Sequence, residues 1–403
     1  MSRRKVVVTG LGAVTSLGLN VSQTWDQLVQ GHSGVGNITL FDTSDSITRI
    51  AAEVPAGFEE IAFASIKKRN RIKMTRIGEF ALIAAREAIA DAKLQDGLDK
   101  ERTEVIIGAT GSGYTSVEGK REGEYIVRSM INSLSAWISL EFGIKGANFT
   151  VNTACASSAY AMGLAYDRIA SGQAVAVIAG GTESMVSKEG IAGFNELMAL
   201  SENNAAGSKA CRPFDKNRDG FVMGEGAGML LLESYESALN RNAKIYCELA
   251  GYSITSEAYN IVAPEKEGLG MARTINLALK NSGLKPEDIH YINAHGTATH
   301  LNDLYETKAI KNVFGELAYR IPVSSSKSMI GHTLGAAGAL EALVTVRSVA
   351  EDLVTPTINY TETDPECDLD YVPNKTRKHA VQAAISNSFG FGGHNCTLVF
   401  KKT

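Results

Sequence analysis

Segments with the pattern of strands alternate with segments with the pattern of helices, and this alternation restricts the folds open to the chain. Residues 5–9 and 104–109 are short apolar runs of the kind that form buried strands, whereas residues 23–30 and 75–94 repeat apolar side chains at helical spacing. Strands that alternate with helices are typical of domains in which helices cover the faces of a sheet. The sequence therefore predicts an α/β fold.

A weak internal repeat favours two similar halves. The strand and glycine turn at 104–113 resemble 289–299, and the small-residue helix expected after residue 155 resembles 331–344. Each half would then contribute its own strands and helices to one molecule. The expected halves are residues 1–243 and 244–403.

The composition describes an ordinary globular chain and excludes several classes of partner. Of the 403 residues, 44% are hydrophobic and 21% charged, with 40 basic against 44 acidic side chains. This balance argues against nucleic acid or an anionic membrane as a partner. Only three valines follow the basic N-terminal residues, and no apolar run approaches the ~18–20 residues that span a bilayer, so neither secretion nor membrane insertion is expected.

The cysteines indicate the compartment. All five are widely spaced, and none forms a C-x-x-C pair. This spacing argues against a disulfide scaffold or a zinc ribbon. We therefore expect a cytoplasmic protein.

The stretch ANFTVNTACASSAY, residues 147–160, places a cysteine where a strand passes into a helix. Phe149 and Val151 alternate with polar residues, and apolar residues then recur at helical spacing up to Gly172. Cys155 is expected in the first turn of the helix, where unpaired N–H groups favour a thiolate and lower the pKa below the ~8.5 of a free cysteine. The alternative is an inert cysteine that acts as a small hydrophobic side chain.

Three further stretches place polar or gating residues at predicted strand ends. His295 follows an apolar strand in NAHGTATHLND. Lys327 and His332 flank a strand-to-helix turn in SSSKSMIGHTLGAAGA, and Phe391 lies in SNSFGFGGHN, the loop of a predicted C-terminal hairpin. Because α/β sheets form sites beyond the carboxyl ends of their parallel strands, these residues are expected to converge with Cys155.

This set of side chains favours one chemistry. A cysteine beside a histidine suits an acyl-transferring thiol. A hydrolase needs only one general base, whereas two neutral imidazoles can donate hydrogen bonds to a developing enolate oxygen. The combination indicates carbanion chemistry on a thioester.

Two other sites can be drawn from the same sequence. His295, His300 and Asp303 could ligate a metal, but histidines five apart across a glycine turn do not match the i, i+4 spacing of helical metalloprotease sites, so no metal site is expected. Gly10 and Gly12 follow a strand as in a dinucleotide-binding oxidoreductase. Thr15, however, stands where the third glycine of that motif belongs.

Four motifs together resemble one family. VNTACASS, NAHGTAT, SSSKSMIGH and NSFGFGGHN, in this order, resemble those of β-ketoacyl-acyl carrier protein synthases, most closely the elongating type II enzymes of bacterial fatty acid synthesis. The similarity extends from VVVTGLGAVTSLG to the final strand. It implies an enzyme with the thiolase fold, in which two pseudo-symmetric halves stack in five layers as α-β-α-β-α, and a dimer.

The resemblance implies a role for each catalytic residue. Cys155 would accept an acyl chain from a phosphopantetheine thioester. His295 and His332 would promote decarboxylation of malonyl-acyl carrier protein, and the resulting enolate would attack the acyl-cysteine. Lys327, paired with Glu306, would set the electrostatics around the histidines.

It also implies how the substrate is held. Backbone N–H groups of Cys155 and Phe391 would form an oxyanion hole, and Phe391 would gate the acyl pocket. Thr297 and Thr299 would bind the pantetheine arm. No cofactor would be bound permanently, because the phosphopantetheine thioester arrives on the acyl carrier protein.

Three departures from the family pattern leave the pathway open. The segment between Gly113 and Cys155 is shortened, Met198 stands where an arginine commonly contacts the carrier protein, and His300 replaces a proline. The chain could therefore be the active ketosynthase of a type II polyketide or aryl-polyene pathway, in a heterodimer with a chain-length-factor homologue rather than a homodimer. The intact cysteine and both histidines argue against a third class, a non-catalytic scaffold.

Overall fold

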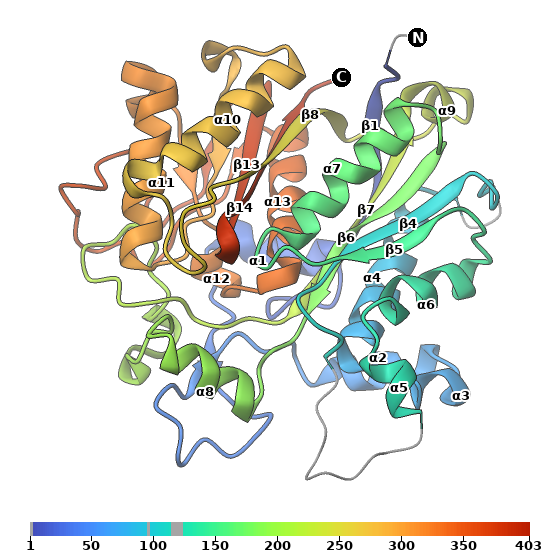
Figure 1. Cartoon of the computed structure of the whole chain (residues 1–403), viewed down its shortest axis with the longest axis horizontal. Coiled ribbons are helices and arrows are strands. Elements are labelled where there is room, and N and C mark those ends of the chain that lie inside the picture. The colour runs from blue at the N-terminus through green and yellow to red at the C-terminus, as the bar shows by residue number, and fades with distance from the viewer. Residues whose placement is uncertain (1–2, 95–96, 114–123) are drawn as a thin grey trace.

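A computed structural model describes residues 3–94, 97–113 and 124–403, so part of the shortened segment after Gly113 lies outside the described residues. The chain forms a ten-stranded sheet that runs through both halves and carries helices on its faces (Figure 1). Across the described ranges, no helix combines the length and the apolarity that crossing a bilayer requires.

Each half contributes five strands to the large sheet. The first half supplies β1 (Val6–Val14), β4 (Thr103–Gly108), β5 (Asn148–Val151), β6 (Ala176–Glu183) and β7 (Gly226–Ser234). The second half supplies β8 (Cys247–Ser256), β9 (Tyr291–Asn293), β10 (Val323–Ser324), β13 (Ala383–Gly390) and β14 (His394–Lys401). Two small sheets pair β2 (Gly36–Asn37) with β3 (Ile50–Ala51), and β11 (Leu353–Val354) with β12 (Arg377–Lys378).

The two halves of the sheet have the same topology. Their spatial orders, β1-β7-β6-β4-β5 and β8-β14-β13-β9-β10, correspond strand for strand. In each half the first two pairings are antiparallel and the last two parallel, and antiparallel pairing of β1 with β8 joins the halves. Strands β4 and β9, which carry the sequence repeat, occupy equivalent positions. The expected pseudo-symmetry is confirmed.

Helices complete five layers. Helices α7 (Ser157–Ala170) and α13 (Ala337–Glu351) contact each other and strands of both halves, so they form the central layer (Figure 1). On the outer face of the first half lie α4 (Arg76–Asp91) and α6 (Ser133–Phe142). On the outer face of the second lie α10 (Leu269–Ser282) and α11 (His300–Phe314). The order is α-β-α-β-α, as expected.

The remaining helices connect these layers or extend from them. They are α1 (Val21–Gln30), α2 (Gly57–Ser65), α3 (Lys68–Arg71), α5 (Tyr125–Ser129), α8 (Lys188–Glu196), α9 (Tyr235–Asn240) and α12 (Lys327–Ile330). Helix α1 shows how local sequence fixes its ends: the Asn20 side chain accepts a hydrogen bond from the Gln23 N–H, and Gly31 ends it at a φ of 71°. The boundary expected after residue 243 falls between α9 and β8.

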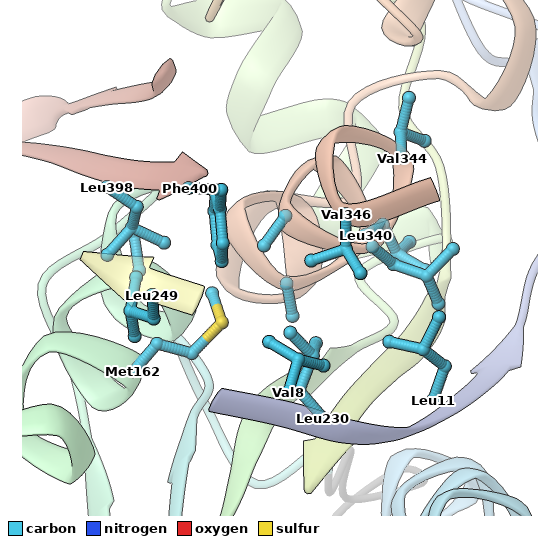
Figure 2. Packing of buried hydrophobic residues seen from close by; sticks show 14 of the residues in the cluster. Val8, Leu11, Met162, Leu230, Leu249, Leu340, Val344, Val346, Leu398 and Phe400 are labelled. Carbon is cyan, nitrogen blue, oxygen red and sulfur yellow. The ribbon is translucent and has the colours of Figure 1, made fainter. Parts of the chain in front are cut away.

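The largest core cluster lies between the halves. Figure 2 shows Val8 and Leu230 from the first half facing Phe400 and Leu249 from the second, with Met162 of α7 beside them. Each of these five side chains is fully buried. Burial of such a side chain contributes about 1.5–3 kcal/mol, so this cluster holds the halves together as one unit.

Gly10 and Gly12 serve packing in β1. A Cβ atom at either position would overlap a backbone carbonyl oxygen of α4, that of Ala88 or of Ala84 respectively. The strand is buried along its whole length, and it pairs with β7 and β8 on its two edges. The glycines allow close approach of a helix to a strand, which explains them without a dinucleotide.

The packing of α4 on β1 leads to a stability prediction. Gly12→Ala should lower the free energy of unfolding by at least about 2 kcal/mol, because the new methyl group forces strand and helix apart. The matched control is Gly193→Ala in α8, where an added Cβ meets nothing within 4 Å and stability should be unchanged or slightly higher. Denaturant unfolding measures both. Equal stability of Gly12→Ala and wild type would contradict this account.

Candidate active site

Cys155 lies in a tight turn between β5 and α7. Helix α7 begins at Ser157, so Cys155 precedes the helix by two residues, and the prediction of a first-turn position was wrong by that amount. Ala154 has a φ of 50°, and the N–H groups of Ala156 and Ser157 donate to the Thr153 and Ala154 carbonyls at 3.1 Å, so this stretch forms a turn ahead of the helix. The Ser157 hydroxyl fixes the turn, since it accepts from the Thr153 N–H at 2.8 Å and donates to the Ala154 carbonyl at 2.6 Å.

The thiol is less acidic than predicted. Burial raises the pKa of Cys155 to about 12, and the charge of Lys327 and the N–H of Phe391 offset only part of that rise. The expectation that the helix terminus would lower this pKa was wrong, because desolvation of the thiolate outweighs the nearby positive groups. Cys155 is therefore a neutral thiol before substrate arrives.

Both histidines converge on the thiol. His332 Nε2 lies 3.1 Å from Cys155 Sγ, and the rings of His332 and His295 are 5.4 Å apart and nearly perpendicular. Burial, followed by the positive charge of Lys327, lowers the pKa of each histidine well below its usual value. Both imidazoles are therefore neutral.

Hydrogen-bond partners assign the tautomer of each imidazole. The Leu334 backbone N–H lies 3.3 Å from His332 Nδ1, and Lys327 Nζ lies 3.3 Å from His295 Nδ1. A backbone N–H and an ammonium are donors only, so both Nδ1 atoms are acceptors. Each neutral ring then carries its proton on Nε2.

Lys327 pairs with Glu341, not with Glu306. Lys327 Nζ forms a buried ion pair with Glu341 of α13 and donates to the His295 carbonyl at 2.6 Å, and both side chains of the pair are only 1% exposed. Burial raises the pKa of Glu341 to about 7, and Lys327 opposes that rise. Glu341, the His295 carbonyl and His295 Nδ1 thus give the ammonium three acceptors.

Glu306 positions the turn that carries His295. Its Oε1 and Oε2 accept from the backbone N–H groups of His295 and Gly296, both at 2.8 Å. Burial raises the pKa of Glu306 to about 7, while these N–H donors lower it. The predicted pairing of Glu306 with Lys327 was wrong, because the Glu306 carboxylate accepts hydrogen bonds from the backbone N–H groups of His295 and Gly296 instead.

Asp303, one helical turn earlier, holds the next part of the same loop. It accepts from the backbone N–H groups of Thr297 at 2.9 Å and Ala298 at 3.1 Å. This use of the carboxylate explains Asp303 without the metal site considered with His295 and His300. In the described chain, a different set, Cys155, His295 and His332, brings its donor atoms within 4.8 Å of one another.

The glycine-rich loop reaches the cysteine from the C-terminal hairpin. A Cβ on Gly390 would lie 2.9 Å from the Thr153 carbonyl oxygen and 3.2 Å from the Cys155 backbone nitrogen, so glycine permits this approach. Phe391 follows directly and is half-buried, with its ring 6.5 Å from that of Phe194. Its N–H is among the groups that favour a negative charge on the Cys155 sulfur.

A cavity of about 310 Å³ connects the thiol with the surface. Cys155, His295 and His332 lie in its lining, as do Thr297 and Thr299, whose hydroxyls are 2.9 Å apart. Met198 and His300, two of the departures noted in the sequence, also line it. The structure thus places all the predicted side chains except Glu306 and Lys327 on this cavity, and those two lie directly behind His295.

Sequence reasoning missed Glu341. Its signal was present, because a single glutamate interrupts the small and apolar residues of AGALEALV in α13. A charged side chain in a fully buried helix needs a partner, and Lys327 is the buried cation available to it. The sequence also predicted this helix from residue 331, whereas α13 begins at Ala337 after a short 3₁₀ turn.

The ion pair leads to a second stability prediction. Glu341→Gln should lower the free energy of unfolding by about 3–5 kcal/mol, because it leaves Lys327 buried without its counter-ion. Adding Lys327→Met should restore part of that loss. Glu101→Gln, at the exposed pair with Lys145, is the control and should change stability little. An unaltered urea midpoint for Glu341→Gln would exclude this pairing.

Comparisons with known proteins agree with this architecture. Family models match residues 3–238 as a beta-ketoacyl synthase N-terminal domain and residues 246–361 as its C-terminal domain. The 3-oxoacyl-[acyl-carrier-protein] synthase 2 of Synechocystis sp. is 47% identical across 100% of this chain and 99% of its own length. The protein of the same name from Staphylococcus aureus is 42% identical across 99% and 98%.

Solved structures share the fold over the full length. A chain of a type II PKS acyl-carrier protein in complex with its ketosynthase bound to the hexaketide superposes with a TM-score of 0.91 at 34% identity, covering 100% of both chains. A beta-ketoacyl synthase from Burkholderia phymatum gives 0.90 at 34%, covering 99% of this chain and 100% of its own. The chain therefore belongs to the β-ketoacyl synthase family of acyl-transferring condensing enzymes, with the thiolase fold.

Proposed function

We propose that this enzyme condenses an acyl group held on Cys155 with malonyl-acyl carrier protein, giving a β-ketoacyl-acyl carrier protein and CO₂. The observation that carries the proposal is the pair of neutral imidazoles, His295 and His332, placed beside a buried thiol. A hydrolase would need only one of these two imidazoles, as a general base. Two Nε2–H donors around one point suit the oxygen of an enolate.

The first step loads the enzyme. The Cys155 sulfur attacks the acyl thioester carbon, the carrier's thiol leaves, and the thiol proton of Cys155 passes to that leaving sulfur. The Nε2–H of His332 is within hydrogen-bond distance of the Cys155 sulfur and stabilises negative charge there as the proton departs. The N–H groups of Cys155 and Phe391 would bind the oxyanion of the tetrahedral intermediate.

The second step makes the carbon–carbon bond. The malonyl carboxylate leaves as CO₂, and its bonding electrons form an enolate whose oxygen accepts from the Nε2–H groups of His295 and His332. The enolate carbon attacks the acyl-Cys155 carbonyl, the carbon–sulfur bond breaks, and the departing Cys155 thiolate takes up one proton from solvent, which replaces the proton lost to the carrier thiol in the first step. Lys327 keeps His295 in the donor tautomer by facing its Nδ1.

The substrate arm enters through the cavity. Thr297 and Thr299 present hydroxyls to the amide groups of the pantetheine, and Phe391 gates access to the acyl side of Cys155. No permanently bound cofactor is required, since the phosphopantetheine is attached to the carrier protein. Met198, 86% exposed at the cavity mouth, offers that carrier an apolar contact where an arginine is common.

Fatty acid elongation in the cytoplasm, by a homodimer, is the pathway we propose. The relatives at 47% and 42% identity are named 3-oxoacyl-[acyl-carrier-protein] synthase 2. The second candidate is the active subunit of a type II polyketide or aryl-polyene pathway with a chain-length-factor partner. It is supported by the ishigamide ketosynthase/chain length factor structure, which has a TM-score of 0.89 at 35% identity.

Separate variants test the assigned steps. Cys155→Gln should lose acylation and retain decarboxylation of malonyl-acyl carrier protein. His295→Ala should still be acylated, because the Cys155–His332 contact remains, but it should lose about 10²–10³ in condensation rate with one enolate donor removed. Intact mass reports the acyl adduct, and CO₂ release with product analysis reports the second step.

The same experiment can overturn the proposal. If the wild-type protein forms neither an acyl adduct on Cys155 nor CO₂ with a panel of acyl- and malonyl-carrier proteins, the activity is excluded. Equal loss of acylation and condensation in His295→Ala would contradict the division of roles. The length and type of the best acyl donor in the panel, with the oligomeric state of the purified chain, distinguish the two pathways.

A further inference from the structure

The stretch from His295 to Leu301, a loop that leads into the first turn of α11, follows the cavity from its base to its mouth. Exposure rises along it, from 2% at His295 and 5% at Thr297 to 46% at Leu301. Thr299 is half-buried and His300 exposed, and all five residues line the cavity. His300 therefore stands at the outer end of the path on which the substrate arm would lie.

Positive charge is scarce along this path. Among the described residues that line the cavity there is no lysine or arginine, and two of the lining side chains, Asp219 and Glu257, are acidic. His295 and His332 at the base are neutral. His300 is consequently the one lining residue near the mouth that can present a basic imidazole to an anion.

The buried guanidinium that contacts the His300 backbone does not fill this role. Arg218 is buried, donates to Asp364 at 2.6 Å, and lies 3.8 Å from Asp303. Its Nη2 donates to the His300 carbonyl at 3.2 Å, so it fixes the His300 backbone instead of facing the cavity. In this cluster one guanidinium faces two carboxylates, and Asp219 in the cavity lining adds a third, so these groups offer no net positive charge to an anion near His300.

The substrate of the proposed function carries its own anion. A phosphopantetheine arm ends in a thioester at one end and a phosphodiester at the other. With the thioester at Cys155 and the amides at Thr297 and Thr299, the phosphodiester lies toward the mouth. An imidazole can donate an N–H to a phosphate oxygen in either protonation state.

We propose that His300 binds the phosphate of the phosphopantetheine arm and so sets the affinity for the carrier-bound substrate. This inference rests on the proposed function. His300 acts in binding and takes no part in bond making, so its contribution appears in KM and not in kcat.

Paired substrates that differ only in the phosphate test the proposal. Acylation of Cys155 is measured with acyl-phosphopantetheine and with acyl-pantetheine, in wild type and in His300→Gln. The variant should raise KM for acyl-phosphopantetheine about five- to tenfold, the size of one solvent-exposed hydrogen bond, and leave KM for acyl-pantetheine unchanged. The same rise is expected with the acyl-carrier protein.

Two further variants show whether a change in KM comes from loss of the His300 imidazole or from a general effect of substitution on folding. His300→Pro should behave like His300→Gln, because His300 is the first residue of α11, a position that proline occupies readily. His32→Gln, at an exposed histidine outside the cavity, should behave like wild type.

Three outcomes would overturn the inference. An equal KM rise with both small thioesters would mean that His300 shapes the mouth without recognising phosphate. A rise confined to the carrier protein would assign His300 to the protein surface, and no rise at all would assign it no role. Wild-type protein inactive with every acyl thioester would instead refute the proposed function, so the two failures are distinguishable.

Discussion

The buried Lys327 ammonium is the constraint on which the site depends. At 1% exposure it must have acceptors for all its protons, and it finds them in Glu341, the His295 carbonyl and His295 Nδ1. Satisfying the ammonium therefore selects the histidine tautomer and directs its Nε2–H toward the thiol. The same charge helps keep both imidazoles neutral. One buried cation thus organises the donors that enolate chemistry needs.

The architecture supplies this cluster from both halves. Cys155 comes from the first half, ahead of central helix α7, and Glu341 comes from α13, the corresponding helix of the second. The backbone of His332 is anchored on the first half, since its N–H donates to the Val222 carbonyl at 2.7 Å. Neither half holds a complete site, so the continuous sheet and the shared core in Figure 2 are conditions for the chemistry as well as for stability.

Much of the fold could be predicted because its signals are local. Apolar periodicity placed α1, α4 and β4 within a few residues of their observed bounds, and the repeat anticipated that β4 and β9 are equivalent. Element starts were less accurate. Cys155 precedes α7, and residues 331–336, which the sequence assigned to the helix, precede α13. The positive φ at Ala154 and the 3₁₀ turn at Leu334–Ala336 delay the two helix starts, and apolar periodicity reveals neither of them.

By itself, the sequence determined the α/β class, the two similar halves and, through four motifs, which side chains are candidates for chemistry. Only the tertiary structure decided how those side chains act on one another. In the folded chain Lys327 pairs with Glu341 instead of Glu306, and Glu306 accepts a hydrogen bond from the backbone N–H of His295. Burial raises the pKa of Cys155, whereas the helix terminus alone would lower it. The physical reason is that partner choice and desolvation depend on distances and burial in three dimensions, which residue order along a chain does not specify.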